Sequence, residues 1–209
     1  RTAGEDKDNA NWVGSYLLTD EEKENLKNIT EAFENVCIVL NVSNIIDLKW
    51  INDEQFKGHI KSVVIVWQGG MEGGNSVADV LSGKVTPSGK LPDTIAYNME
   101  DYPANDNFGN ELTNLYKEDI YVGYRYFETF APEKVQFEFG FGLSYTTFDI
   151  ETILADADDE KITLEVKVTN TGDKFSGKEV VQVYYEAPQG ALGQPARQLC
   201  AYEKTENLA

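Results

Sequence analysis

The first half of the chain alternates between helical and strand-like hydrophobic patterns. Thr19 and the acidic residues after it are typical of a helix N-terminus, and apolar residues then recur at helical spacing, which predicts a helix near 20–34. Residues 36–40 and 62–67 are instead continuously apolar, as strands of a parallel sheet are when helices cover both faces. We therefore predict an open α/β sheet over residues 1–90.

Glycine and aromatic residues mark the middle of the chain. The loop 68–74 is rich in glycine and leads into a second helix, predicted over 75–82. Residues 98–118 are polar and predict a surface loop. The stretches 120–127 and 137–148 are crowded with Tyr, Phe and Gly, which favours an irregular connection packed against a domain face.

The last part of the chain changes to a period of two. An acidic hinge or turn is predicted at 155–160, and apolar and polar residues then alternate over 162–169. Further strands are predicted at 179–185 and 198–204. Half-buried strands joined by turns are typical of the start of an antiparallel sandwich, and the remaining residues are too few to complete one.

The charge of the chain excludes several classes of partner. The 209 residues contain 36 Asp and Glu against 18 Lys and Arg, a formal net charge of −18. A surface that binds nucleic acid needs clustered cations, so we expect no nucleic-acid partner. Anionic lipid is disfavoured by the same sign, and no apolar run approaches the roughly 20 residues of a membrane helix. We therefore expect no membrane partner either, while the absence of a visible signal peptide leaves secretion open.

Residues that could bind metals or act as nucleophiles are few. Cys37 and Cys200 lie far apart in apolar strand-like runs, which favours buried reduced thiols over a disulfide. His59 is the one histidine of the sequence and follows a polar stretch, so a solvated loop residue is the simpler interpretation than a metal ligand. Ser88 and Ser144 then have no histidine with which to form a catalytic triad. We expect no metal and no cofactor.

The glycine-rich loop 68–74 lies between a predicted strand and a predicted helix, a layout that often holds anions. It lacks both G-x-x-x-x-G-K-[ST] and G-x-G-x-x-G, the patterns of phosphate and dinucleotide sites. A tight strand-to-helix turn with close backbone approach is therefore favoured over phosphate binding. A nucleotide-binding protein is the least favoured functional class.

One carboxylate has a position that suggests chemistry. Glu5 lies between Gly4 and Asp6 in the loop 1–15, before the first predicted helix. If Arg1 ends a preceding parallel strand, this loop emerges at the carboxyl edge of the sheet, where open α/β sheets hold ligands. A glutamate there, beside other carboxylates, could have a raised pKa and serve as a proton donor. From the residues alone, a solvated loop carboxylate is the favoured interpretation.

Several motifs together resemble glycoside hydrolase family 3. The matching segments, in the family's order and spacing, are WQGGMEGGN (67–75), ADVLSG (78–83), PSGKLP (87–92), YVGYRYF (121–127) and FGFGLSYTTF (139–148). Residues 161–185 are similar to the fibronectin type III-like domain that follows in these proteins. The resemblance spans essentially the whole chain.

The resemblance implies a fold class and a division into domains. The class is α/β: a truncated α/β/α sandwich with an open, mostly parallel sheet, followed by an incomplete fibronectin type III-like antiparallel β-sandwich. Residues 1–148 would belong to the C-terminal α/β sandwich domain of the family, without its N-terminal part. Residues 149–209 would begin the fibronectin type III-like domain.

The resemblance also implies an activity. Family members are retaining hydrolases of the β-glucosidase type, which use two carboxylates about 5–5.5 Å apart. In the family the nucleophile is an aspartate on a separate (β/α)₈ barrel, and the acid/base is a glutamate in a G-E-G-x-D-R-like loop. The segment RTAGEDKDN (1–9) is similar to that loop and aligns Glu5 with the acid/base, with Asp6 where glycine is common and Asn9 where arginine is common.

The partners that follow from the resemblance are a β-linked glucoside or oligosaccharide and the barrel domain, which is missing from these residues. The chain alone is expected to be inactive. A non-catalytic scaffold or a carbohydrate-binding module is the alternative, in which the aromatic side chains of residues 121–127 contact sugar. Core packing is the simpler explanation for most of those side chains.

Overall fold

The computed structural model describes residues 8–209, and the chain divides into two compact units. The described part of the first unit comprises residues 8–77 and 95–117, and the second unit comprises residues 78–94 and 118–209. The second unit therefore includes a short segment from the middle of the chain, residues 78–94, and this segment contains the PSGKLP motif.

The first helix, α1 (Asp20–Ala32), begins where the sequence predicts. The Thr19 Oγ1 atom accepts a hydrogen bond from the Glu22 amide at 3.1 Å, and the Glu22 carboxylate accepts one from the Thr19 amide at 2.8 Å. This reciprocal pair is a capping box, which satisfies two amides that would otherwise lack a partner at the helix N-terminus. Leu26 and Thr30 are the buried residues of this helix.

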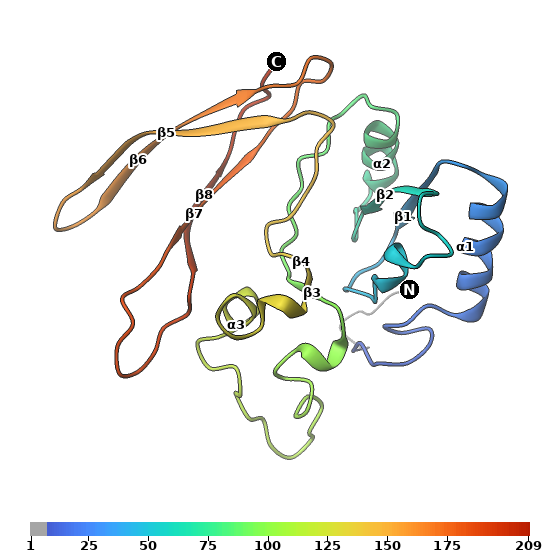
Figure 1. Ribbon diagram of the computed structural model, residues 1–209, viewed down its shortest axis with the longest axis horizontal. Coiled ribbons are helices and arrows are strands. Elements are labelled where there is room, and N and C mark those ends of the chain that lie inside the picture. Colours follow the sequence, from blue (N-terminus) through green and yellow to red (C-terminus); the bar gives the residue numbers. More distant parts are fainter. Residues whose placement is uncertain (1–7) are drawn as a thin grey trace. The chain divides into compact units, whose positions relative to one another are not determined.

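The strands β1 (Val36–Leu40) and β2 (Ile60–Ile65) pair in parallel, as predicted (Figure 1). A short 3₁₀ helix, η1 (Lys49–Asn52), lies between them in the sequence. The buried apolar side chains of the first unit come largely from segments that flank the strands: Tyr16, Leu18, Leu26, Val36, Val42, Ile46, Leu48, Trp50, Phe56, Ile95 and Ala96.

The prediction that both faces of these strands are buried is wrong for the described residues. In β1 only Val36 is buried, and Val39 is 39% exposed. Cys37 is exposed as well, and so is Cys200, although both are free thiols as expected. The physical reason is that β1 and β2 form a two-stranded sheet, so residues 8–209 do not supply the flanking strands that would cover these side chains.

The middle of the chain contains short elements. The helix α2 (Gly73–Leu81) agrees with its prediction, and residues 98–118 are mostly irregular. The remaining elements are β3 (Ile95–Ala96), η2 (Met99–Asp101), α3 (Tyr124–Phe130), η3 (Pro132–Lys134) and β4 (Val135–Phe137). The helix α3 corrects the expectation of an irregular connection over residues 120–127. None of the helices in residues 8–209 combines the length and apolarity needed to cross a bilayer.

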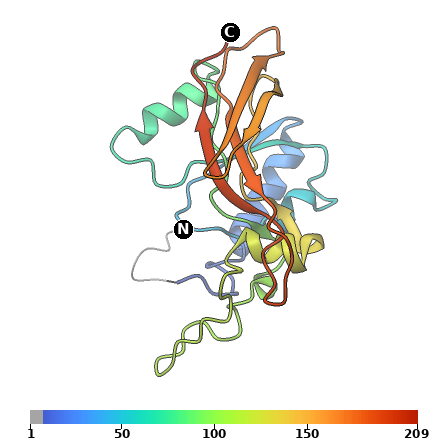
Figure 2. The ribbon, with the colours of Figure 1, turned by 90° about the vertical axis from the view of Figure 1, so that its left-hand side faces the viewer.

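Two antiparallel strand pairs, coloured gold to red in Figure 2, make up most of the second unit. They are β5 (Phe148–Ala157) with β6 (Ile162–Asn170), and β7 (Val180–Tyr185) with β8 (Gln198–Lys204). β6, β7 and β8 agree with the predicted strands, whereas β5 is not among them. The acidic stretch 155–160, predicted as a hinge or turn, begins inside β5, and only its last residues turn. There the Asp158 side chain accepts hydrogen bonds from the amides of Glu160 and Lys161.

The apolar side chains of β6 are more exposed than the predicted half-buried strand implies. Ile162 is 72% exposed and Leu164 is 39% exposed. Within the part of the chain that the structure describes, β5 and β6 pair only with each other, so no second sheet covers this end of the strand.

Replacement of Thr19 by Ala is expected to weaken α1, because the Glu22 amide loses its acceptor. Losses at such caps are typically about 1 kcal/mol, which corresponds to roughly fivefold faster opening of the first helical turn. Hydrogen exchange measured by mass spectrometry on peptides from α1 tests this. Thr113→Ala, in an exposed loop, is the control and should leave the exchange of α1 unchanged.

Candidate functional site

The proposed acid/base, Glu5, lies outside the described residues, which begin at Asp8. The Asn9 side-chain amide donates to the carbonyl of Ile45 at 2.7 Å, and the Asp47 amide donates to the carbonyl of Tyr16 at 3.0 Å. The residues around 45–47 follow the carboxyl end of β1. The segment around Asn9 is therefore bound to the chain that leaves the carboxyl edge of the parallel pair, where α/β sheets hold ligands.

Tyr16 is the most strongly perturbed titratable group near this segment. Its side chain is 2% exposed, and burial raises the pKa of its phenol well above the usual range. The neighbouring Tyr102 and the carboxylates of Asp47, Glu100 and Asp101 raise the pKa further. Tyr16 consequently stays protonated near neutral pH, which makes it a packing residue of this segment and not a base.

The glycine-rich loop after β2 is a tight turn, as predicted. A Cβ atom on Gly69 would lie 2.7 Å from the Cα atom of Gly73, so the two backbone segments approach more closely than any side chain allows. The Glu72 carboxylate accepts a hydrogen bond from the Asn75 side chain at 2.5 Å, a local contact at the start of α2. Gly69 is thus required for backbone packing, whereas a Cβ atom on Gly70, Gly73 or Gly74 would meet nothing within 4 Å.

Trp67, two residues after the end of β2, has a positive φ of 48°. A bulky residue in this region is a backbone outlier that costs of order 1–3 kcal/mol and persists only where its surroundings impose it. The sequence carries no signal for it, since tryptophan has no preference for positive φ.

The other candidate nucleophiles and ligands form structural contacts. His59 lies in the turn before β2, with its Nδ1 atom 3.2 Å from the carbonyl oxygen of Phe33. The Ser88 Oγ atom accepts a hydrogen bond from Lys204 Nζ at 3.3 Å, and the Ser144 Oγ atom accepts one from the Thr146 amide. No cluster of three or more His, Cys, Asp or Glu side chains suited to a metal ion occurs among the residues described.

The aromatic residues of α3 pack mostly against one another. Phe127 is 1% exposed and makes an edge contact with Tyr126, whose ring also lies 5.7 Å from that of Phe130. Tyr121 contacts Phe130 with ring centroids 4.8 Å apart. Most of the rings named here are therefore used in packing against one another, as expected.

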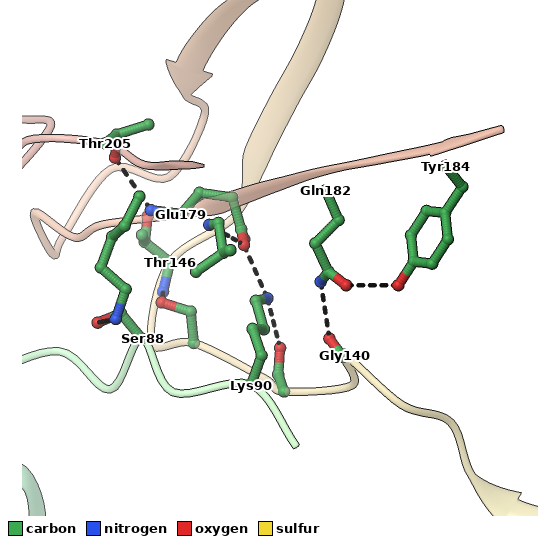
Figure 3. A network of polar contacts seen from close by, with 12 residues as sticks. Ser88, Lys90, Gly140, Thr146, Glu179, Gln182, Tyr184 and Thr205 are labelled. Carbon is green, nitrogen blue, oxygen red and sulfur yellow. Dashed lines mark hydrogen bonds and ion pairs between the residues drawn. The ribbon is translucent and has the colours of Figure 1, made fainter. Parts of the chain in front are cut away.

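A half-buried ion pair connects two of the family-like motifs with the fibronectin type III-like segment inside the second unit. Lys90 Nζ, from PSGKLP, lies 2.7 Å from Glu179 Oε1, and the two side chains are only 19% and 14% exposed. The same ammonium donates to the carbonyl of Gly142 at 2.9 Å (Figure 3). The Glu179 carboxylate also accepts a hydrogen bond from the Val180 amide, at the start of β7. The motifs therefore meet at one charged contact.

The two glycines of FGFGLSYTTF have different reasons: Gly142 lies against the backbone of Gly89, and Gly140 has a positive φ of 81°. A Cβ atom on Gly142 would collide with the carbonyl oxygen of Gly89, and one on Gly140 would collide with the Gln182 side chain. The amides of Leu91 and Gly140 donate to the carbonyls of Phe141 and Leu91, both at 2.8 Å. These two bonds hold the PSGKLP segment against the glycine motif in a geometry that leaves no room for a side chain.

Comparison with known proteins assigns the chain to a family. The model of the glycosyl hydrolase family 3 C-terminal domain matches residues 1–124, more than half of the chain. The chain belongs to glycoside hydrolase family 3. A second model, of a fibronectin type III-like domain, matches residues 179–209 of this family 3 chain. The α/β part followed by antiparallel strands agrees with both matches, whereas the predicted boundary between residues 148 and 149 lies in the unmatched stretch.

Curated relatives of this family 3 chain are β-glucosidases. It is 53% identical to a β-glucosidase of Ruminococcus albus, over 100% of this chain and 21% of that protein. It is 39% identical to a β-glucosidase of Kluyveromyces marxianus, over 97% of this chain and 23% of that protein. The chain thus spans about a fifth to a quarter of the length of these curated relatives, as a part of a larger enzyme does.

Solved structures of similar proteins have the same fold. A β-glucosidase from Paenibacillus barengoltzii matches 99% of this chain and 23% of its own with a TM-score of 0.94 and 60% identity. β-Glucosidase 3B from Thermotoga neapolitana, in complex with glucose, matches 100% of this chain and 29% of its own with a TM-score of 0.90 and 37% identity.

Gly142→Ala in this family 3 chain is expected to destabilise the second unit by about 1–3 kcal/mol, because the added methyl group forces the backbone of Gly89 away. Faster hydrogen exchange of the Leu91 and Gly140 amides measures the effect. Gly190→Ala is the matched control, since a Cβ atom there meets nothing within 4 Å. Equal exchange in the two variants would contradict the close-packing explanation.

Lys90→Met is expected to lower the free energy of unfolding by about 1–3 kcal/mol, because it leaves the half-buried carboxylate of Glu179 without its cation. Thermal unfolding of the protein measures the loss. The control is Lys84→Met, whose partner Asp79 forms an exposed pair that contributes at most about 1 kcal/mol. Adding Glu179→Gln to Lys90→Met should recover part of the stability, and a double variant no more stable than Lys90→Met would argue against the pairing.

Proposed function

We propose that this chain is the acid/base-bearing part of a retaining β-glucosidase-like hydrolase. The observation that carries the proposal is the 53% identity to the Ruminococcus albus β-glucosidase over all 209 residues. Because the match covers 100% of this chain, it includes the segment RTAGEDKDN (1–9), in which the family resemblance aligns Glu5 with the acid/base.

Glu5 is the general acid/base in this proposal. Its carboxyl group first protonates the glycosidic oxygen of the leaving group, and as a carboxylate it then takes a proton from the incoming water. The contact between Asn9 and Ile45 supports the assignment, because it ties the following residues to the segment beyond the carboxyl end of β1. An acid/base on a loop at this edge would face a ligand.

The nucleophile belongs to a part of the enzyme outside these residues. A retaining mechanism needs a second carboxylate about 5–5.5 Å from the first, and the resemblance assigns it to an aspartate on a (β/α)₈ barrel. We accordingly propose that the barrel and a β-linked glucoside or oligosaccharide are the partners of this chain. We also propose that residues 1–148 and 149–209 are its two domains, both incomplete, and that the chain alone does not turn over substrate.

Glu5→Ala in the full-length enzyme is expected to lower kcat for an activated aryl glucoside by about 10²–10⁴-fold, since general acid/base catalysis typically contributes that much. The second step, hydrolysis of the glycosyl-enzyme, slows because no group deprotonates water. Azide needs no deprotonation, so its addition should restore turnover and yield a glucosyl azide of retained configuration. Steady-state kinetics with product analysis measures both effects.

Glu34→Ala is the control, an exposed glutamate after the end of α1. Its kinetics should equal those of the unmodified enzyme. Unchanged turnover in Glu5→Ala, or a loss that azide does not restore, would remove Glu5 from the acid/base role.

A further inference from the structure

The second unit contains a pocket of about 230 Å³ that the catalytic proposal does not use. It is formed by α3, by the turn at residues 138–141, by β7 and by Arg197 before β8. Sites for drug-sized ligands occupy about 300–1,000 Å³, so a cavity slightly below that range suits a smaller ligand.

Aromatic rings form the apolar wall of this pocket. Tyr124 stacks on Phe139 with centroids 4.6 Å apart, and Tyr184 meets the ring of Tyr124 edge-on at 6.0 Å. The Tyr124 hydroxyl accepts a hydrogen bond from the Leu199 amide at 2.8 Å, which fixes the ring orientation. The wall therefore exists before any ligand binds.

A chain of hydrogen bonds holds the polar side chains of the pocket in place (Figure 3). The Tyr184 hydroxyl donates to Gln182 Oε1 at 2.7 Å, and Gln182 Nε2 donates to the carbonyl of Gly140 at 3.3 Å. Burial, then the nearby Tyr124, Glu128 and Glu138, raise the pKa of Tyr184, which keeps its hydroxyl a donor. The amide of Gln182 has a second N–H, which this chain of bonds leaves available.

Charges of both signs line the same pocket. Arg197 lies 3.6 Å from the Glu128 carboxylate and 3.4 Å from that of Glu186, which lies outside the pocket lining. The Glu138 carboxylate forms no hydrogen bond or ion pair with the rest of residues 8–209. An acceptor, a guanidinium and an amide donor thus surround one aromatic wall.

This combination selects the class of ligand. Two carboxylates disfavour an anion, and the guanidinium disfavours a simple cation. A neutral ring with hydroxyl groups can donate to the carboxylates, accept from Arg197 and Gln182, and place its apolar C–H face on the aromatic wall. We propose that this pocket binds one neutral monosaccharide, with Glu138 and Gln182 as its main hydrogen-bonding residues.

None of the residues that line the pocket belongs to the Glu5 loop, so the proposal does not depend on the acid/base assignment. Isothermal titration of the full-length enzyme with D-glucose tests it, after treatment with a 2-deoxy-2-fluoroglucoside that occupies the catalytic site. One glucose site should remain. Glu138→Ala and Gln182→Ala should each weaken it by about tenfold or more, the usual effect of losing a hydrogen bond to a charged or buried polar group.

Glu133→Ala, an exposed glutamate on η3 outside the pocket, is the matched control and should bind glucose as the unmodified enzyme does. Glu138 is itself exposed, so its variant should fold even if Gln182→Ala does not. Absence of a remaining site, or a remaining site that neither variant weakens, would overturn the proposal. Failure of the fluoroglucoside to react would count against the retaining mechanism alone, because glucose sites can still be compared between Glu138→Ala and the control.

Discussion

The ion pair between Lys90 and Glu179 is the contact on which the arrangement of the second unit depends. The Lys90 ammonium group also donates a hydrogen bond to the carbonyl of Gly142, so three segments that are distant in the sequence contact the same cation. Removing such a charge from water is costly unless its partners are all in place. The PSGKLP segment, the glycine motif and the start of β7 are therefore mutually constrained, and the pocket formed by the same turn and strand inherits that rigidity.

The elements that could be predicted from the sequence are those with a local cause. The helix α1 has a capping box at Thr19, and β6 has a strict alternation of apolar and polar residues. The helix α3 was not predicted, because it begins after Gly123, at a φ of 60°, without any capping side chain. The exposure of Cys37 could not be predicted either, since burial depends on which strands lie beside β1.

The two candidate sites also differ in whether a local sequence pattern predicts them. Glu5 could be found because its neighbours in the sequence resemble a known loop, whereas its geometry falls outside the described residues. The pocket could not be found, because Tyr124, Glu138, Gln182 and Arg197 come from separate segments that no short motif connects. The one signal in the sequence is the glycine motif that contains Gly140. Its link to the pocket becomes visible only with the position of the Gln182 side chain, which lies against Gly140.

The surplus of acidic residues bears on how such a protein would recognise a glycoside. A net charge of −18 repels anions over distances up to about the Debye length, roughly 8–10 Å in physiological salt, but exerts no net force on a neutral sugar. Selection of a neutral ligand must therefore come from short-range hydrogen bonds and ring contacts. Carboxylates are suited to this because they accept from hydroxyl groups, and in the proposed pocket Glu138 stands beside aromatic rings and the amide of Gln182.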